Sequence, residues 1–462
     1  MKRPQFLLTN AICAFGLLSL ARPTADAQQP PQATELPGSP WSIKQTWMIG
    51  GMGPWDYLAM DATAGRLFIA HGSQVQVVDV KTGTPVGQVT GLRDAHDIAL
   101  DASGEFGYIS DGLANDVKVF DRRTFQVVAS IPTGSTPRAL VLEPQTGLLF
   151  AICTNPMIEP QLVASDRGTA GAGRASPSSQ LSRAALQANS SRSIKTTISV
   201  IDVQARRRIG EVLMPGKLGF AQANDQGQLF VLLVNRNQVA RVDAQAIADA
   251  LHRSSNASLK PRAPNTSIGA ESAPVSDGGS STGSNASSTK DKDFSPPILD
   301  WSNEQGSRDQ GQGSMRLFAL GSACPEPRSL AVDGHHQRIF AACNNMKLAV
   351  VNTGTGEIVT SLPIGPGTDS VGYDASRGLI YTANGGAQGT LTVIRQDVTD
   401  TYAEIENLPT RQRARTLAIN SENGQIYLVT DYMGVNLAKQ GGIGTLKSVP
   451  VEGSFQVLVV GQ

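Results

Sequence analysis

Residues 97–121 read DIALDASGEFGYISDGLANDVKVFD, three short runs of alternating apolar and polar residues separated by two turns rich in Gly, Asp and Asn. The preceding residues 56–79, DYLAMDATAGRLFIAHGSQVQVVD, repeat the same order of runs and turns. Alternation with a period of two predicts β-strands, and the residues between the runs are typical of tight hairpin turns. The chain therefore contains a repeated unit of short antiparallel strands.

This unit recurs along the chain at intervals of roughly 40 residues, which is the period of a propeller blade. The residue that ends the first run of each unit is Asp61, Asp101, Glu143, Ala223, Asp333, Asp374 or Asn420. The two long intervals, on either side of Ala223, each equal one repeat plus an insertion. Seven such units predict an all-β fold, a seven-bladed β-propeller.

The two ends of the repeat region predict how the ring closes. The last unit has runs at 417–419, 426–429 and 455–460, which is one run fewer than the others. Residues 43–49, IKQTWMI, resemble the outer run of the other units. A propeller that joins its first and last strands in one blade leaves no raw sheet edge. We therefore expect residues 41–462 to form a single propeller domain whose N- and C-terminal strands share the last blade.

Composition narrows the possible partners. Charged residues make up 17% of the chain, and the 39 Lys and Arg residues are balanced by 39 Asp and Glu. A net charge of zero lacks the broad positive surface of a non-specific nucleic-acid binder, so strong binding of that kind is not expected. No segment after the N-terminal leader approaches 18 uninterrupted apolar residues, so no transmembrane segment is predicted in the mature chain. We expect a monomer.

The N-terminal residues indicate export. A basic start, Met1-Lys2-Arg3, is followed by an apolar stretch over 6–21 and by Ala25-Asp26-Ala27, the order of a secretory signal peptide with a small-residue cleavage site. We expect residues 1–27 to be removed and the mature protein to be periplasmic or extracellular. Residues 28–40, which are rich in Pro and Gln, are expected to form a flexible lead.

Three segments resemble a known repeat family. Tyr108-Ile109-Ser110-Asp111, Phe340-Ala341-Ala342-Cys343 and Tyr381-Thr382-Ala383-Asn384 are similar to the Tyr-Val-Thr-Asn motif of YVTN β-propeller repeats. The overall order resembles that of exported YncE-like proteins. The resemblance covers residues 41–462 apart from two insertions, and it implies the propeller fold rather than a particular activity, because propellers host many functions.

Two low-complexity segments interrupt the ring. The first, about 154–196, is rich in Ser, Ala, Gly and Arg and falls between the second and third strands of the third unit. The second, about 254–314, is rich in Ser, Asn, Gly, Thr and Pro and falls after the third strand of the fourth unit. Such compositions bury too little apolar surface to offset the entropy of ordering, so both are expected to be disordered. Residues 244–252, before the second insertion, are expected to form a short surface helix.

One position in the repeat carries charge in six of the seven units. Directly before the innermost strand, the units have Asp56, His96, Arg138, Leu218, Arg328, Asp369 and Arg415. These residues should encircle one mouth of the central channel. Guanidinium groups match carboxylate or phosphate oxygens, so the charged mouth predicts a site for an anionic small ligand. The alternative interpretation is that the arginines pair with aspartates of neighbouring blades as structural ties.

A second group of residues could hold a divalent metal. His71 and Asp111 end equivalent strands in units one and two, and His96 begins unit two, so all three are expected on the face that carries the charged mouth. Imidazole and carboxylate groups are metal ligands and can also act as acid and base. The alternative interpretation is turn capping and ordinary hydrogen bonding. No other cofactor is predicted.

The cysteines predict one disulfide. Cys324 precedes the inner strand of the fifth unit and Cys343 ends the adjacent antiparallel strand, so both are expected at one end of a hairpin. Export permits their oxidation. Cys153 is left over and is expected to be a buried, unreactive thiol.

Two classes of function remain open after the sequence analysis. The first is a non-catalytic exported propeller that binds a small ligand, a glycan or a protein partner at the charged mouth. The second is a propeller enzyme of lactonase or quinone-dependent dehydrogenase type that uses the same face. The lack of a clear base–metal spacing or cofactor motif in the sequence favours the first.

Overall fold

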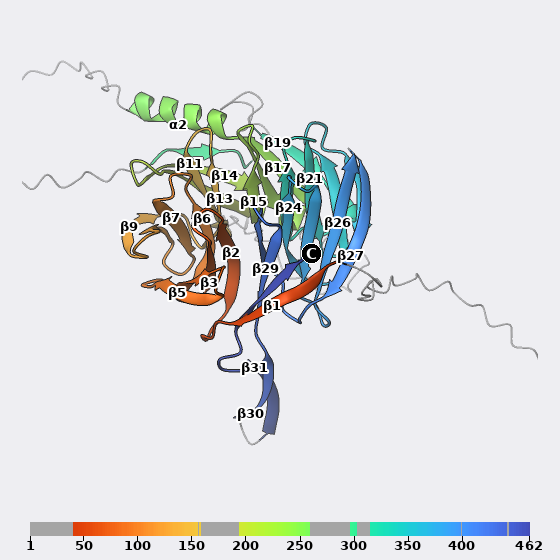
Figure 1. Ribbon diagram of the computed structural model, residues 1–462. Helices are drawn as coiled ribbons and strands as arrows, with labels where there is room; N and C mark the ends of the chain where they lie inside the picture. Colours follow the sequence, from red (N-terminus) through yellow and green to blue (C-terminus); the bar gives the residue numbers. More distant parts are fainter. Residues whose placement is uncertain are drawn as a thin grey trace, which may run out of the picture.

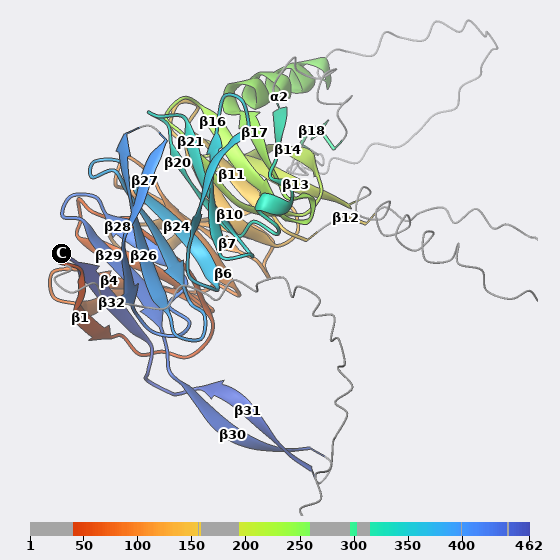
Figure 2. The ribbon, with the colours of Figure 1, turned by 90° about the vertical axis from the view of Figure 1, so that its right-hand side faces the viewer.

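The computed structural model describes residues 40–155, 157–158, 194–258, 296–302, 315–398, 400–440 and 443–462. These residues form seven sheets around a central axis, with α2 on the outer rim (Figures 1 and 2). The predicted all-β, seven-bladed propeller is therefore confirmed. The expected signal peptide, 1–27, and nearly all of the expected lead, 28–40, lie outside the described residues.

The chain begins each blade at the inner strand and proceeds outward. Blade 1 comprises β2 (Trp55–Asp61), β3 (Arg66–His71), β4 (Gln74–Asp79) and β5 (Thr84–Val89). Blade 2 comprises β6 (Ala95–Leu100), β7 (Phe106–Asp111), β8 (Asp116–Asp121) and β9 (Val127–Pro132). Blade 3 comprises β10 (Pro137–Glu143), β11 (Leu148–Cys153), β13 (Ile194–Asp202) and β14 (Arg207–Pro215).

The next blades repeat this order. Blade 4 comprises β15 (Leu218–Ala223), β16 (Gln228–Leu233), β17 (Gln238–Asp243) and β19 (Met315–Ala319), with short 3₁₀ turns at Val234–Arg236 and Gly321–Ala323. Blade 5 comprises β20 (Ser329–Asp333), β21 (Arg338–Cys343), β22 (Lys347–Asn352) and β23 (Ile358–Pro363). Blade 6 comprises β24 (Thr368–Asp374), β25 (Leu379–Asn384), β26 (Thr390–Val398) and β27 (Thr401–Pro409).

The last blade closes the ring with strands from both ends of the repeat region, as the sequence predicts. β28 (Leu417–Asn420), β29 (Gln425–Thr430) and β32 (Gln456–Gly461) are joined by β1 (Ser42–Met48), which pairs antiparallel with β32 (Figure 1). The Trp47 ring of β1 packs on Tyr427 of β29 with 5.6 Å between ring centroids. Gly83 lies beneath the same indole, and a side chain there would overlap it, so this turn requires glycine.

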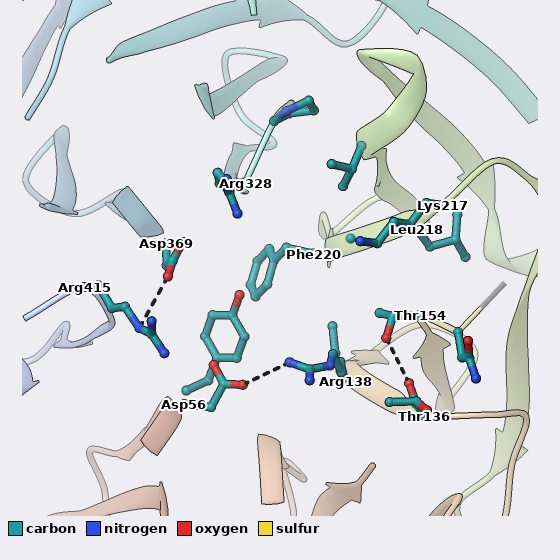
Figure 3. A pocket seen from close by; sticks show the side chains of 16 residues that line it. Asp56, Thr136, Arg138, Thr154, Lys217, Leu218, Phe220, Arg328, Asp369 and Arg415 are labelled. Atoms are coloured by element: carbon teal, nitrogen blue, oxygen red, sulfur yellow. Dashed lines mark hydrogen bonds and ion pairs between the residues drawn. The ribbon is translucent and has the colours of Figure 1, made fainter. Parts of the chain in front are cut away.

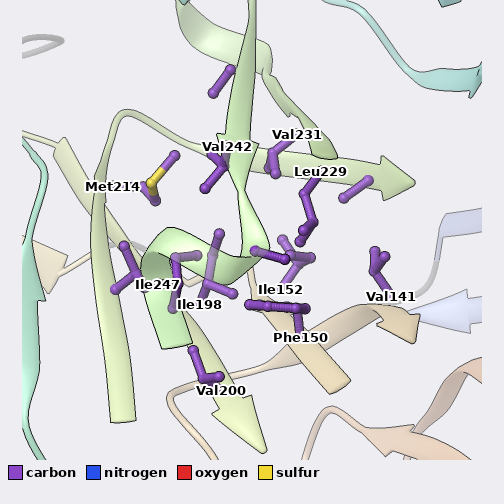
Figure 4. Close-up of a cluster of buried hydrophobic side chains, with 14 of the residues drawn as sticks. Val141, Phe150, Ile152, Ile198, Val200, Met214, Leu229, Val231, Val242 and Ile247 are labelled. Carbon is purple, nitrogen blue, oxygen red and sulfur yellow. The ribbon is translucent and has the colours of Figure 1, made fainter. Parts of the chain in front are cut away.

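The hydrophobic core lies between consecutive blades. The cluster between blades 3 and 4 includes Phe150 and Ile152 of β11 and Val231 of β16, and Ile247 of the helix packs against it (Figure 4). Successive side chains of a strand point to opposite faces of its sheet, and each face packs against one neighbouring blade. Each sheet is therefore covered on both faces.

The second insertion contains more structure than the sequence analysis expected. The helix α2 spans Ala244–Ser258, and β18 (Ile298–Asp300) adds a parallel strand to the outer edge of β14. Trp301 follows β18 and is fully buried in the cluster that α2 covers. The expectation that all of 254–314 lacks a core was therefore wrong for 296–302. A composition averaged over the whole segment conceals one short apolar run, Ile298-Leu299-Asp300-Trp301.

The first insertion begins later than expected and ends earlier. Residues Met157–Ile158 form β12, which pairs with the start of β13, and β13 already begins at Ile194. The rest of the expected segment, 156 and 159–193, lies outside the described residues.

A two-stranded hairpin stands away from the ring in blade 7. It consists of β30 (Met433–Gln440) and β31 (Ile443–Pro450) and lies between β29 and β32 in the chain (Figure 2). The sequence analysis assigned no strands to this segment. The antiparallel order of the blade places the hairpin on the face where chains enter the inner strands, which is called the top face below.

Candidate functional site

The charged position identified from the sequence lies at the top-face mouth of the central channel. Asp56, His96, Arg138 and Asp369 are the second residues of the inner strands β2, β6, β10 and β24. Arg328 and Arg415 lie just before the inner strands β20 and β28. Because each inner strand contacts the next around the whole ring, this position forms a closed circle.

The mouth opens into a cavity of about 690 Å³ (Figure 3). Five of the six predicted residues line it: Asp56, Arg138, Arg328, Asp369 and Arg415. His96 does not. The sequence analysis did not select Lys217, Tyr57 or Phe220, which also line the cavity. Lys217 directly precedes Leu218, the one uncharged residue at this position, and this adjacency is the signal that could have revealed it.

Two of the arginines face aspartates across the mouth. The Arg138 guanidinium lies 3.9 Å from the Asp56 carboxylate, and Arg415 Nε lies 3.3 Å from Asp369 Oδ2 (Figure 3). The side chains of Arg138 and Arg415 are 49% and 44% exposed. Ion pairs this exposed contribute little to stability. The Arg415–Asp369 pair joins neighbouring blades, as the structural-tie interpretation expects, whereas Arg138 of blade 3 reaches Asp56 of blade 1. Both pairs are too exposed to act as strong ties.

Arg328 and Lys217 make no ion pair among the described residues, and both side chains face the cavity (Figure 3). The cavity is therefore lined by four cationic side chains and two carboxylates. Burial also raises the pKa of Asp369, an effect that Arg415 and Arg328 oppose. Protonation of Asp369 would remove one negative charge and make the net charge of the cavity lining more positive. The site is electrostatically suited to an anion.

His96 supports the mouth from below. It is 5% exposed, its Nδ1 lies 2.8 Å from Asp56 Oδ2, and its Nε2 lies 2.9 Å from Asp94 Oδ2. His96 thus fixes the orientation of Asp56 and is a positioning residue rather than part of the cavity wall.

Two aromatic rings form the floor of the cavity. Tyr57 of β2 and Phe220 of β15 are each partly buried, and their ring centroids are 5.2 Å apart. Phe220 also lines a second cavity of about 450 Å³, whose other residues lie further along the inner strands. The ring of Phe220 therefore separates an upper cavity at the charged mouth from a lower one within the channel.

Asp97 lines the lower cavity and ties two blades together. Its carboxylate accepts hydrogen bonds from the backbone N–H groups of Ile98 and of Leu140 in blade 3, at 2.8 and 2.9 Å. Burial raises the pKa of Asp97 to about 7, although these hydrogen bonds favour the charged form. Among the described residues this is an unusual carboxyl group, one that titrates near neutrality.

Solved structures match this architecture. The WD40 repeats of RRP9 align with 90% of this chain and 96% of their own, at a TM-score of 0.55 and 8% identity. A chain of the mitotic checkpoint complex aligns with 94% of this chain and 99% of its own, at 0.53 and 11%. Hydrazine synthase of Kuenenia stuttgartiensis aligns with 87% and 95%, at 0.52 and 12%.

The chain has a WD40-like propeller fold. At these identities the likeness shows the fold alone. No protein-family model matches the chain, and no curated protein matches its sequence. In the described part of the propeller, no helix is long and apolar enough to cross a membrane.

The propeller does not assemble the predicted metal ligands. His71 bonds to Gln76 at 2.8 Å and to the Gly53 carbonyl at 3.2 Å, while Asp111 accepts hydrogen bonds from the backbone N–H groups of Arg93 and Asp94. His96 is held between two aspartates as described above. Across the described ranges, no group of three or more His, Cys, Asp or Glu side chains could hold a metal ion. These residues instead make the local hydrogen bonds of the alternative interpretation.

The predicted disulfide is present. Cys324 and Cys343 are joined, with 4.9 Å between their Cα atoms, and Cys153 is a buried free thiol. Burial raises the pKa of Cys153 to about 11, which keeps it protonated and unreactive. Cys343 also lines a groove that continues from the mouth over blades 5 to 7 and shares Arg328, Asp369 and Arg415 with the main cavity.

Proposed function

We propose that this propeller binds a small anion in the top-face cavity and does so without catalysis. The observation that carries the proposal is the excess of cationic side chains around the mouth, with Arg328 and Lys217 free of ion pairs among the described residues. Guanidinium and ammonium groups in this arrangement attract carboxylate or phosphate oxygens. A glycan or protein partner, also left open by the sequence, would have to present an acidic group here.

The test is a comparison of anion binding by the parent protein and by Arg328→Gln. Calorimetry with sulfate, citrate and benzoate should detect binding to the parent. The variant should bind more weakly by about 1–3 kcal/mol, the usual loss for a hydrogen bond to a charged group. Its melting temperature should stay the same or rise slightly, because Arg328 has no ion pair to lose.

The matched control is Arg123→Gln. Arg123 is exposed in the turn between β8 and β9, on the face opposite the mouth. This change removes one positive charge without touching the cavity, and it should leave anion affinity within experimental error. If no anion binds the parent, and if Arg328→Gln, Arg138→Gln and Arg415→Gln each lower the melting temperature, the arginines are structural ties and the proposal is wrong.

We also propose that the protein is exported and belongs among the YVTN-type propellers. The N-terminal pattern over 1–27 and the degenerate motifs of units two, five and six support this. Expression with the native leader, followed by fractionation and N-terminal sequencing, should find Gln28 as the first residue of the mature protein. Retention of Met1 in a membrane fraction would contradict export.

The enzyme alternative has a separate test. Metal analysis and an absorption spectrum of the purified protein should show neither stoichiometric calcium nor a quinone chromophore if the binding function is correct. Either finding would move the assignment to a lactonase or a quinone-dependent dehydrogenase.

A further inference from the structure

One position of the inner strands differs in blade 1 from the other six blades. The residue directly after the charged position is Tyr57 in blade 1, and elsewhere it is small or polar: Asp97, Ala139, Gly219, Ser329, Ser370 and Thr416. Of these six, Ala139 and Gly219 line the same upper cavity as Tyr57, and both are small. Tyr57 is therefore the one large ring that this position contributes to the cavity.

The following position carries the partner ring. It is Phe220 in blade 4, whereas the other six blades have an aliphatic residue: Leu58, Ile98, Leu140, Leu330, Val371 and Leu417. The sequence therefore places its two exceptional aromatic residues in different blades, at positions that meet in the channel. Their rings lie 5.2 Å apart with an interplanar angle of 41°. Both rings line the upper cavity and neither is fully buried.

The unpaired cations lie beside these rings. Lys217 precedes β15, the strand that carries Phe220, and Arg328 belongs to the next blade. Figure 3 shows Arg328, Lys217 and Arg138 around Phe220, and the paired Asp369 and Arg415 also border the mouth. The net positive charge and the exposed aromatic surface are thus adjacent within one cavity of about 690 Å³, a volume in the usual range for organic ligands.

We propose that the anion bound at the mouth is an aromatic carboxylate, with its acid group between Arg328 and Lys217 and its ring against Phe220 and Tyr57. This inference rests on the proposed function and adds the chemical class of the ligand. Aromatic rings prefer offset or edge-to-face contacts with other rings, which a saturated ring of equal size cannot reproduce. A third ring would cover the aromatic surface that the cavity leaves open.

The hydroxyl group of Tyr57 is compatible with an anionic ligand. Burial raises the pKa of Tyr57 well above its usual value, and the nearby Asp56, Asp97 and Asp369 add to this effect. The phenol therefore stays neutral at any ordinary pH. It can donate a hydrogen bond to a ligand oxygen and does not repel a carboxylate.

The first experiment needs no variant. Calorimetric titration of the full-length protein with benzoate and with cyclohexanecarboxylate compares two monocarboxylates of similar size and equal charge. Benzoate should bind about three- to tenfold more tightly, which is the range expected for an added aromatic contact. Equal affinities, or tighter binding of the saturated acid, would overturn the inference.

The second experiment uses Phe220→Leu. Leucine occupies the equivalent position in four other blades, so the variant introduces a side chain that this fold already accepts there. The preference for benzoate over cyclohexanecarboxylate should shrink in the variant, because the ring of the ligand then keeps only its contact with Tyr57. A variant that keeps the full preference for benzoate would contradict the role of Phe220.

The failure of this inference is distinguishable from the failure of the proposed function. If both acids bind equally and Arg328→Gln weakens both, the mouth binds anions but does not select rings. If neither acid binds, and sulfate and citrate do not bind either, the anion site itself is absent and both proposals are wrong.

Discussion

At the scale of single residues, Asp97 and Ser329 make the same contact in different blades. Asp97 accepts the backbone N–H of Leu140 in blade 3, and Ser329 accepts that of Val371 in blade 6 at 3.2 Å. The serine does this without charge. The carboxyl group of Asp97 is buried, and burial raises its pKa to about 7. Only the aspartate therefore makes the tie between blades dependent on pH.

We predict that Asp97→Ser removes a pH dependence of stability. Between about pH 4 and 7 the folded state keeps a proton on Asp97 that the unfolded chain has lost, so stability falls as pH rises through this window, by up to about 4 kcal/mol. Urea unfolding at pH 5 and pH 7.5 covers part of this window and should show a fall of about 2–3 kcal/mol in the parent and a smaller one in the variant. The same pH dependence in both proteins would contradict the assignment.

Asp369 should couple pH to ligand binding. Its raised pKa means that it takes up a proton as pH falls, before an ordinary carboxyl group would, and the mouth then becomes more positive. Sulfate keeps its charge over this range, so its affinity should rise as pH is lowered. Asp369→Asn should bind sulfate more tightly at pH 8 and should show less pH dependence. Affinity that rises with pH would exclude this role.

The sequence predicts the charged mouth because six of the seven units carry an ionisable residue at one position, next to inner-strand positions that are mostly apolar. It does not predict which charges are compensated. Arg138 and Asp56 belong to blades 3 and 1, and they approach each other past blade 2, a contact between non-adjacent repeats that spacing along the chain does not reveal. The predicted metal ligands are also not brought together. The side chains of His71 and Asp111 instead bond to the loops that enter their own blades.

At the scale of elements, the Cys324–Cys343 link fixes the entry to blade 5 next to the mouth. It encloses a loop with a sequence separation of 19 residues, for which the chain-entropy estimate is about 3 kcal/mol. The double variant Cys324→Ser/Cys343→Ser should be less stable by that order in urea. Alkylation of native protein without reductant should modify neither cysteine, and labelling of both would show that the bond does not form.

Trp301 tests the packing of β18. The backbone N–H of Trp301 donates a hydrogen bond to the Leu213 carbonyl of β14 at 2.9 Å. The indole of Trp301 is fully buried under α2. Trp301→Ala should lower the free energy of unfolding by about 3–5 kcal/mol, as for other buried tryptophans. Ile298→Ala in the same strand is the control, because Ile298 is 59% exposed and should cost little. Equal small effects would mean that the segment does not pack.

These elements also show where sequence reasoning stops. The strands of the blades follow from alternation and turn residues, and α2 follows from an Ala-rich run. The parallel strand β18 has only three residues and no periodicity to detect, and it is held by a neighbouring blade. The segment 433–450 that forms β30–β31 contains four glycines, a residue that is depleted in strands, so residue preference does not distinguish it from a loop.

At the scale of the whole molecule, β1 is the strand that converts seven sheets into a closed ring. It covers the outer edge of β32, and its register runs from Ser42 opposite Gly461 to Met48 opposite Gln456. Trp47 is buried between blades 7 and 1, and Trp41 lies against Tyr381 of blade 6. The short segment 41–48 therefore covers the open edge of the last blade and also fills the interfaces of that blade with both of its neighbours.

This arrangement predicts that the position of β1 in space matters and its position in the chain does not. Because Ser42 lies opposite Gly461, a two-residue Asn-Gly turn after Gln462 could lead directly into Trp41 and make an ordinary hairpin. A permuted chain that starts at Gly53 and ends with residues 41–52 should melt cooperatively within a few degrees of the parent. The matched chain that lacks 41–52 leaves two tryptophan sites empty, each worth about 3–5 kcal/mol, and should not fold cooperatively. A cooperative melt of the shortened chain at the parent's temperature would show that the ring closes without β1.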